Sequence, residues 1–251
     1  MKSVTNRFAA FLTALLAAAA PLVSPGAPAS PDYDRYASLL EAFVSEDGVR
    51  YAAWRSDTAS TEALDRFLEE AAGVDVGALG PDARKAFYLN LYNAAMLQAV
   101  LDRYPLDSVK QIGPEPFWIF GHPFIEQGGR TLSLDDVEKG ILLEEFADPR
   151  IHFAVNCASE SCPALRSEPY RAEELDAQLD AQARQFARSS HAAIISEAEE
   201  AVAFSKLFDW YADDFGVEHP ARYLNRFRES PLPVDYAVRW QEYDWSLNEA
   251  P

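Results

Sequence analysis

The sequence has little positive charge for its length. Its 251 residues include 22 lysines and arginines against 40 aspartates and glutamates, which gives a formal net charge of −18 at pH 7. Proteins that bind nucleic acid or anionic membranes neutralise phosphates with clustered basic side chains. No basic stripe is present, so the composition argues against nucleic acid and anionic lipid as partners.

Histidine and cysteine, which most often ligate transition metals, are also scarce. The four histidines, at positions 122, 152, 191 and 219, do not have the spacing of metal ligands. There are two cysteines, at positions 157 and 162. We therefore predict neither a metal nor a cofactor.

A long apolar run occurs only near the start of the chain. Lys2 and Arg7 are followed by an almost continuous apolar run over residues 8–22, and Ala27-Pro28-Ala29 offers small residues for cleavage. About 15 apolar residues fall short of the ~20 that span a bilayer, which favours a cleaved secretory signal over an uncleaved anchor. We expect residues 1–29 to be removed near Ala29. The remaining chain should be periplasmic or secreted, and soluble without stable membrane insertion.

Residues 30–251 are expected to fold as a single α+β domain, dominated by helices, with a small β-sheet. No linker or internal repeat divides them. A β-hairpin is predicted at 124–126 and 130–132, and strand-like segments at 49–51 and 151–155, of which the latter is expected to be a buried strand of the sheet. Apolar periodicity and capping signals predict helices over residues 31–43, 61–72, 81–104, 133–146, 172–188 and 205–215.

Several segments are distinctive in composition and in their order along the chain. They are residues 86–94, 133–138, 148–154, 157–163, 205–211 and 243–248. Together they resemble the family called domain of unknown function 547, over nearly all of the chain after the signal. The resemblance and the signal imply an exported bacterial member of that family, whose name states that no general activity is assigned. Members often have histidine after the glutamate that corresponds to Glu138, where this chain has Lys139, so a mechanism that needs that imidazole lacks it here.

The loop that begins at Asn156 holds the strongest candidate for chemistry. Cys157 follows the predicted buried strand, a place where an acyl-transferring enzyme would position a nucleophile. His152 is the candidate base, but residues five apart on a strand face opposite sides, so the two side chains meet only if the chain bends sharply after Val155. On this hypothesis the protein is a thiol-dependent hydrolase or acyl transferase with a peptide-like substrate.

A disulfide between Cys157 and Cys162 is the alternative. Two cysteines in an exported chain that has no others are most simply joined, because compartments outside the cytoplasm favour oxidation. On this second hypothesis the protein is a non-catalytic envelope domain that binds a small molecule or an envelope protein. We favour the second hypothesis, and the sequence leaves the first open.

Other polar residues have two interpretations each. Asn90 and Asn93 lie one turn apart on a helix predicted to be buried, so their amides either bond to neighbouring loops or orient groups of a site. Glu138 is either a buried acid that faces the cysteine loop or the partner of an arginine such as Arg150. The aromatic run over residues 117–124 is either part of the core or a ligand groove.

Overall fold

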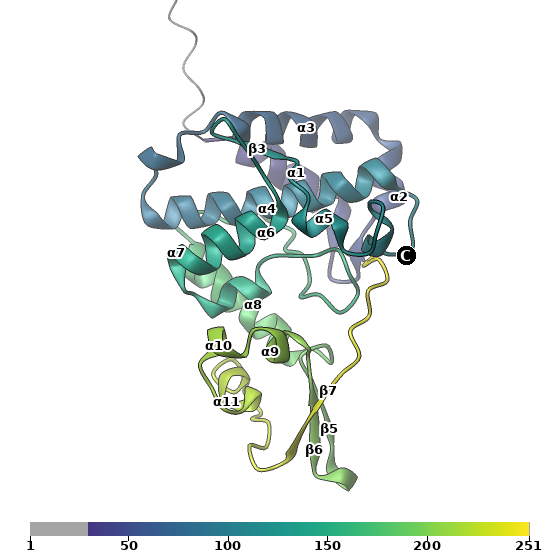
Figure 1. The fold of residues 1–251 in the computed structure, drawn as a ribbon, viewed down its shortest axis with the longest axis vertical. Coiled ribbons are helices and arrows are strands. Elements are labelled where there is room, and N and C mark those ends of the chain that lie inside the picture. Colours follow the sequence, from purple (N-terminus) through teal and green to yellow (C-terminus); the bar gives the residue numbers. More distant parts are fainter. Residues whose placement is uncertain (1–29, 251) are drawn as a thin grey trace, which may run out of the picture.

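The computed structural model describes residues 30–250, so the predicted signal, residues 1–29, lies outside the described residues. The described chain is mainly helical with short strands, which confirms the predicted α+β class (Figure 1). The α-helices are α1 (Tyr33–Phe43), α2 (Tyr51–Ser56), α3 (Thr58–Ala72), α4 (Pro81–Arg103), α5 (Trp118–Gly121), α6 (Leu134–Val137), α7 (Glu144–Phe146), α8 (Leu175–Arg188), α9 (Leu207–Trp210), α10 (Ala212–Phe215) and α11 (Pro220–Leu224). The strands are β1 (Val44–Ser45), β2 (Gly48–Val49), β3 (Ile125–Gln127), β4 (Arg130–Leu132), β5 (Ala193–Ser196), β6 (Ala201–Phe204) and β7 (Ala237–Trp240).

Short 3-10 and π segments complete the chain. The 3-10 helices are η1 (Val76–Ala78), η2 (Val109–Gln111), η4 (Pro149–Phe153) and η5 (Glu197–Glu199). The π-helix η3 (Glu138–Leu143) joins α6 to α7 without a break, so residues 134–146 form one helix, as predicted. A capping box is present at its start, where Ser133 and Asp136 bond to each other's backbone N–H groups.

The long helix α4 organises the first hydrophobic core. Pro81 occupies its first turn, where a missing N–H needs no partner, and almost every residue from Ala86 to Leu101 is buried. Helices α2, α3 and α6 and the π-helix η3 contact α4, and α1 packs against α3 (Figure 1). Within residues 30–250, no helix combines the length and the apolar character needed to cross a membrane.

The second core is built around a three-stranded sheet that the sequence analysis did not predict. Strand β6 lies in the middle, antiparallel to β5 and parallel to β7. The end of α8, the strand β6 and the short helices α9, α10 and α11 supply its buried side chains. The helix predicted over residues 205–215 is present but is divided at Tyr211 into α9 and α10.

The segment predicted to be a buried strand is instead the 3-10 helix η4, so the prediction for residues 151–155 was wrong. Pro149 begins the turn with a suitable fixed φ, and the Asp148 carboxylate accepts the backbone N–H of Arg150 at 3.1 Å. A short apolar run alone does not distinguish a strand from a buried helical turn, and here the capping residues decide. Ile151 packs in the first core and Phe153 in the second, so η4 joins the two cores.

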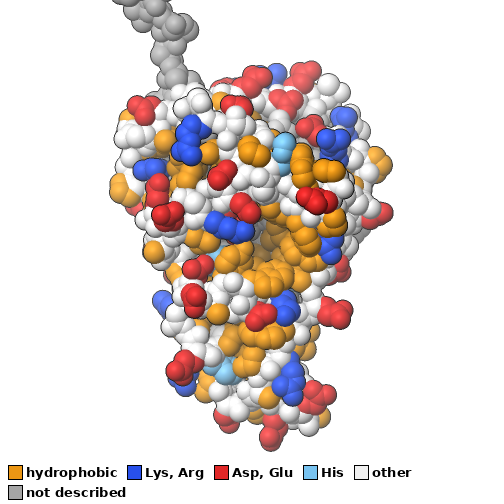
Figure 2. All heavy atoms as spheres, in the orientation of Figure 1, with side chains coloured by type: hydrophobic (Ala, Val, Ile, Leu, Met, Phe, Trp, Pro, Cys, Tyr) orange, Lys and Arg blue, Asp and Glu red, His pale blue; other side chains and the backbone are white. Residues whose placement is uncertain are grey.

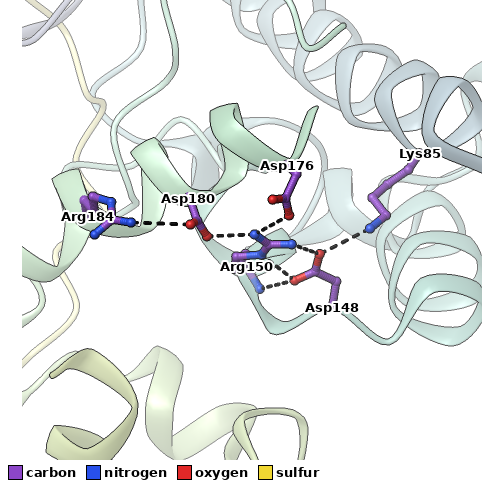
Figure 3. Close-up of polar contacts among 6 residues, drawn as sticks. All are labelled: Lys85, Asp148, Arg150, Asp176, Asp180 and Arg184. Atoms are coloured by element: carbon purple, nitrogen blue, oxygen red, sulfur yellow. Dashed lines mark hydrogen bonds and ion pairs between the residues drawn. The ribbon is translucent and has the colours of Figure 1, made fainter. Parts of the chain in front are cut away.

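Ion pairs hold η4 between α4 and α8 (Figure 3). The Arg150 guanidinium lies 2.9 Å from a carboxylate oxygen of Asp176 and 2.7 Å from one of Asp180, both on α8. The Asp148 carboxylate lies 2.9 Å from the Arg150 guanidinium and 3.2 Å from the ammonium of Lys85, which is on α4. Asp176 is exposed, and the other, partly buried pairs fix the segment that leads into the cysteine loop.

The segment after β7 returns along the molecule to the first core (Figure 1). We call this segment, residues 241–250, the tail. The Val49 N–H donates to the Asn248 carbonyl at 2.9 Å, and the Ala250 N–H donates to the Val49 carbonyl at 3.0 Å. Leu247 is buried in the first core. The tail therefore connects the second core to the first.

Gly48 permits this close approach, and replacing it should detach the tail. Its φ is +118°, and a Cβ at this position would overlap the carbonyl oxygen of Asn248. We expect Gly48→Ala to lower the free energy of unfolding in urea by about 1–3 kcal/mol, because both the backbone strain and the overlap oppose folding. Gly80→Ala is the matched control, because φ is −66° there and nothing lies near the added carbon, and it should change the value by less than about 1 kcal/mol. Equal losses in the two variants would contradict the prediction.

Candidate functional site

A cavity of about 680 Å³ lies where the two cores and the tail meet. Figure 2 shows a hollow on this face, with hydrophobic side chains gathered around it. Aromatic side chains form much of its lining, among them Phe117, Phe120, Trp210, Tyr211, Tyr243 and Trp245. Glu138, His152, Cys157 and Cys162 also line it. The cavity therefore collects four of the predicted site residues.

The aromatic rings contact one another in a continuous wall. The ring centre of Trp245 lies 4.6 Å from that of Tyr243 and 4.7 Å from that of Phe117. Trp210 extends the wall, with its ring centre 4.9 Å from that of Tyr243. The wall thus combines three segments that are far apart in the sequence: the start of α5, the end of α9 and the tail. The aromatic run predicted over residues 117–124 contributes one part of it.

The thiol of Cys157 is half-buried at the cavity and surrounded by hydrogen-bonding groups. Its sulfur lies 2.9 Å from the Ser159 hydroxyl and 3.4 Å from the Tyr243 hydroxyl. Burial alone would raise the pKa of this thiol, but hydrogen bonds from Cys162, Ser159 and Tyr243 outweigh burial and lower the pKa to about 7. Burial and the neighbouring Cys157 sulfur raise the pKa of Cys162, so Cys157 loses its proton first.

Both cysteines are free in the structure, and the disulfide expected between Cys157 and Cys162 is not formed there. The Cys162 sulfur instead accepts the backbone N–H of Cys157 at 3.0 Å. Thiols are also metal ligands, but among residues 30–250 no group of three or more histidine, cysteine, aspartate or glutamate side chains could hold a metal ion. The pair is a dithiol that opens onto the cavity.

The side chain of Asn156 holds the cysteine loop, residues 157–162, at both ends. Its Nδ2 donates to the Pro163 carbonyl at 2.8 Å, and its Oδ1 accepts the Ala158 N–H at 2.9 Å. Ala158 has a φ of +58°, in the left-handed region that residues other than glycine rarely adopt. The chain therefore turns sharply just after Cys157.

The tail runs beside the cysteine loop and completes the site. The Glu160 N–H donates to the Ser246 carbonyl at 2.8 Å, and the Ser161 N–H donates to the Asp244 carbonyl at 3.2 Å. This backbone pairing places the hydroxyl of Tyr243 beside the thiol. The tail thus supplies both a wall of the cavity and a hydrogen-bond donor to Cys157.

His152 lines the same cavity, but its hydrogen bond goes elsewhere. Its Nε2 lies 2.8 Å from the Asp214 carboxylate, and its Nδ1 has no partner within the part of the chain that the structure describes. Burial lowers the pKa of His152, and Asp214 only partly offsets this. No hydrogen bond joins His152 to Cys157 among the described residues. The structure does not pair the proposed nucleophile with its proposed base.

Glu138 is a buried acid at the cavity, the first of its two interpretations. It begins the π-helix η3, an irregularity that is frequent at functional sites. The Tyr211 hydroxyl donates to its Oε1 at 3.3 Å, and burial raises the pKa of Glu138. Arg150 pairs with other carboxylates and not with Glu138. Lys139 is exposed and pairs with Asp135 at 2.9 Å.

Asn90 and Asn93 bond to the backbone of neighbouring loops. The Asn90 amide donates to the Tyr170 carbonyl at 2.8 Å and accepts the Tyr170 N–H at 2.9 Å. The Asn93 amide donates to the Ala154 carbonyl at 3.0 Å and accepts the Asn156 N–H at 2.9 Å. Neither lines the cavity, so this is the first of the two interpretations. Asn93 nevertheless positions the backbone that leads into the cysteine loop.

The sequence analysis missed the side chains that complete the site from a distance. Tyr243 and Trp245 come from the tail, and Ser159 comes from the cysteine loop itself. Trp210 ends α9, and Tyr211 follows it. Except for Ser159, these residues lie more than 50 positions beyond Cys157, so no local motif connects them to it. The available signal was the ordered resemblance, whose segments 205–211 and 243–248 contain all four distant residues.

The fold and the site define a helix-rich α+β domain with a dithiol in an aromatic cavity. Residues 76–187 match the model of a family described as "Protein of unknown function, DUF547". This match confirms the resemblance to the DUF547 family over that segment. The matched segment includes Glu138, His152 and both cysteines, and Tyr211 and Tyr243 lie beyond it. Searches among curated proteins and among solved structures gave no match.

Alkylation of Cys157 should follow the ionisation of a thiol whose pKa is lowered. Only the thiolate reacts with iodoacetamide, so the rate should rise with pH around a midpoint near 7 and fall away below it. The measurement is the rate of modification of the Cys157 peptide, followed by mass spectrometry at a series of pH values. A midpoint near the ~8.5 of a free thiol would contradict the hydrogen-bonded environment described above.

Tyr243→Phe tests the donor from the tail, because it removes the hydroxyl and keeps the ring. The midpoint for Cys157 should move to higher pH in this variant. Tyr236→Phe is the matched control, because the hydroxyl it removes bonds to Glu197 outside the cavity. The control should leave the midpoint of the wild-type protein unchanged.

Proposed function

We propose that the chain is an exported binding domain whose ligand is a small molecule held in the aromatic cavity. The observation that carries this proposal is the convergence of an aromatic wall and a few polar groups on one cavity of about 680 Å³. Cavities that bind small molecules usually have volumes of roughly 300–1,000 Å³, with apolar walls and a small number of placed polar groups. The size and the lining both fit this description.

The polar groups at the cavity suit recognition of one side of a ligand. The Cys157 thiol, the Glu138 carboxyl and the Tyr211 hydroxyl all face it, on elements from different parts of the chain. Each of these side chains is already held in place by contacts to the protein, so little side-chain entropy is lost when a ligand binds. The hydrolase hypothesis lacks comparable support, because His152 bonds to Asp214 and not to the thiol.

The charge of the lining favours a neutral or cationic ligand with a flat apolar body. The carboxylates of Glu115, Asp135 and Glu138 line the cavity, and the ammonium of Lys139 is already paired with Asp135. Aromatic faces stack on flat ligands and attract cations. An anionic ligand would meet these carboxylates without a free lysine or arginine in the described lining to offset them.

Nile red, a neutral flat dye, provides a direct test of cavity binding. Its fluorescence should rise and saturate at one dye for each protein molecule. We expect Trp210→Ala to raise the dissociation constant of the dye about tenfold, because the variant removes one ring of the wall. This change corresponds to a loss of roughly 1.4 kcal/mol of binding free energy. The measurement is a fluorescence titration of both proteins.

Trp240→Ala is the matched control for this titration. Trp240 is 37% exposed, similar to the 47% of Trp210, but it lies on β7 and does not line the cavity. Its removal should leave dye affinity unchanged. Equal weakening in both variants, or binding without saturation, would show that the dye adheres to exposed tryptophans and would contradict the proposal.

Export is the second part of the proposal, and it is supported by the basic start, the apolar run over residues 8–22 and the small residues at 27–29. Protein recovered from its native host should begin near Ser30 and fractionate outside the cytoplasm. Sequencing of the amino terminus after fractionation provides the measurement. An intact Met1 on protein from the cytoplasm would rule out this part of the proposal.

A further inference from the structure

We propose that Cys157 and Cys162 form a redox-active dithiol that reduces small neutral or cationic disulfides entering the cavity. The inference rests on the proposed function, because it requires that small molecules reach the cavity. It adds a reaction and a class of substrate to the binding site.

The two thiols occupy unequal positions, as a reaction in two steps requires. Cys157 is half-buried and Cys162 is buried, and both line the cavity. The Cys162 sulfur lies 3.0 Å from the backbone nitrogen of Cys157. Because the N–Cα bond is about 1.46 Å long, this sulfur is within about 4.5 Å of the Cys157 Cα. One sulfur can therefore meet a substrate while the other waits beside it.

The hydrogen bonds around the pair assign the two roles. The Ser159 and Tyr243 hydroxyls lie beside the Cys157 sulfur and stabilise it as a thiolate, the form that attacks disulfides. The lowered pKa of Cys157 and the raised pKa of Cys162 agree with this order of ionisation. Cys157 attacks first, and Cys162 keeps its proton until the second step.

The reaction balances as an exchange of one disulfide for another. The Cys157 thiolate attacks one sulfur of R–S–S–R, the S–S bond breaks, and RS⁻ leaves while a mixed disulfide forms on Cys157. Cys162 then gives up its proton, which RS⁻ accepts, and its sulfur attacks the Cys157 sulfur. The second RS⁻ leaves as the Cys157–Cys162 disulfide forms, and it takes up from water the proton that Cys157 had released on becoming a thiolate. The protein loses two electrons, and the substrate gains them as two thiols.

The lining of the cavity selects the substrate by charge. Glu115, Asp135 and Glu138 contribute carboxyl groups to the lining. The Lys110 ammonium already lies 5.3 Å from the ring centre of Phe117 and 5.5 Å from that of Trp245, so it is chiefly the carboxyl groups that attract a cationic substrate. A disulfide with amino groups should therefore approach more readily than one with carboxylates. Cystamine, hydroxyethyl disulfide and dithiodipropionate form a cationic, neutral and anionic series of similar size.

In the test, the reduced full chain is mixed with each disulfide in turn. Free thiols are trapped with N-ethylmaleimide at a series of times, and the masses of all protein species are measured by mass spectrometry. The chain has two cysteines, so every change in thiol content reports this pair. With cystamine, wild-type protein should lose both thiols together and release two molecules of cysteamine. Each rate is divided by the rate of the same disulfide with 2-mercaptoethanol, because the acidity of the leaving thiol alone changes the rate of exchange. After this correction, dithiodipropionate should react at least tenfold more slowly than cystamine.

Two cysteine variants test the order of the steps. Cys162→Ser should stop at a mixed disulfide on Cys157, and Cys157→Ser should react at least tenfold more slowly than Cys162→Ser. The fold of each variant is checked by circular dichroism. The wild-type reaction needs no substitution and decides the proposal even where a variant does not fold.

Three results would overturn the inference. Two free thiols in wild-type protein after prolonged exposure to cystamine would exclude attack by Cys157. A lasting mixed disulfide would exclude a resolving role for Cys162. Equal corrected rates with cystamine and dithiodipropionate would exclude the proposed substrate class.

The failure of this inference can be distinguished from the failure of the binding proposal. Saturable Nile red binding by wild-type protein that does not react with cystamine would overturn only the redox inference. Reaction with cystamine without saturable dye binding would overturn the proposal of a ligand-binding cavity and leave the thiol chemistry in place.

Discussion

Backbone hydrogen bonds along the tail, residues 241–250, hold the two cores and the site together. At one end the Gln241 N–H donates to the Phe204 carbonyl of the sheet at 2.9 Å. At the other end the N–H of Val49, in β2, donates to the carbonyl of Asn248. Between these two ends the tail pairs with the cysteine loop. Because buried backbone groups need partners, each of these contacts constrains the next. The same segment therefore links the cores and shapes the cavity.

Buried asparagines provide the second constraint, from inside the protein. Asn93, from the middle of α4, holds the chain before the cysteine loop, and Asn156 closes the loop on itself. An amide that satisfies both a carbonyl and an N–H fixes the direction of a loop, whereas apolar packing fixes mainly its distance. The thiol is thus positioned by side chains that never touch it. This separation leaves the walls of the cavity to aromatic residues.

Local signals predicted much of the fold, and contacts between distant segments account for the rest. Apolar periodicity and capping signals located α4 and the helix over residues 134–146, and the hairpin predicted over residues 124–132 is the β3–β4 pair. Strand β7 pairs in parallel with β6 more than 30 residues away, and such pairing leaves no local periodicity to read. The same holds for the site. Both cysteines could be predicted because they lie in one short loop of the sequence. Tyr243 could not be predicted, because only the fold of the tail brings it to the cysteines.

The position of the tail at the end of the chain also determines when the site can form during synthesis and folding. Synthesis proceeds from residue 1 onward, so Cys157, Cys162 and the helix α4 exist well before the segment that carries Tyr243 is made. Until that segment docks, the Cys157 sulfur lacks one of its donors and the cavity lacks a wall. In nascent or partly folded chains the pKa of the Cys157 thiol is therefore closer to that of a free cysteine. The reactivity of this thiol marks the completion of folding.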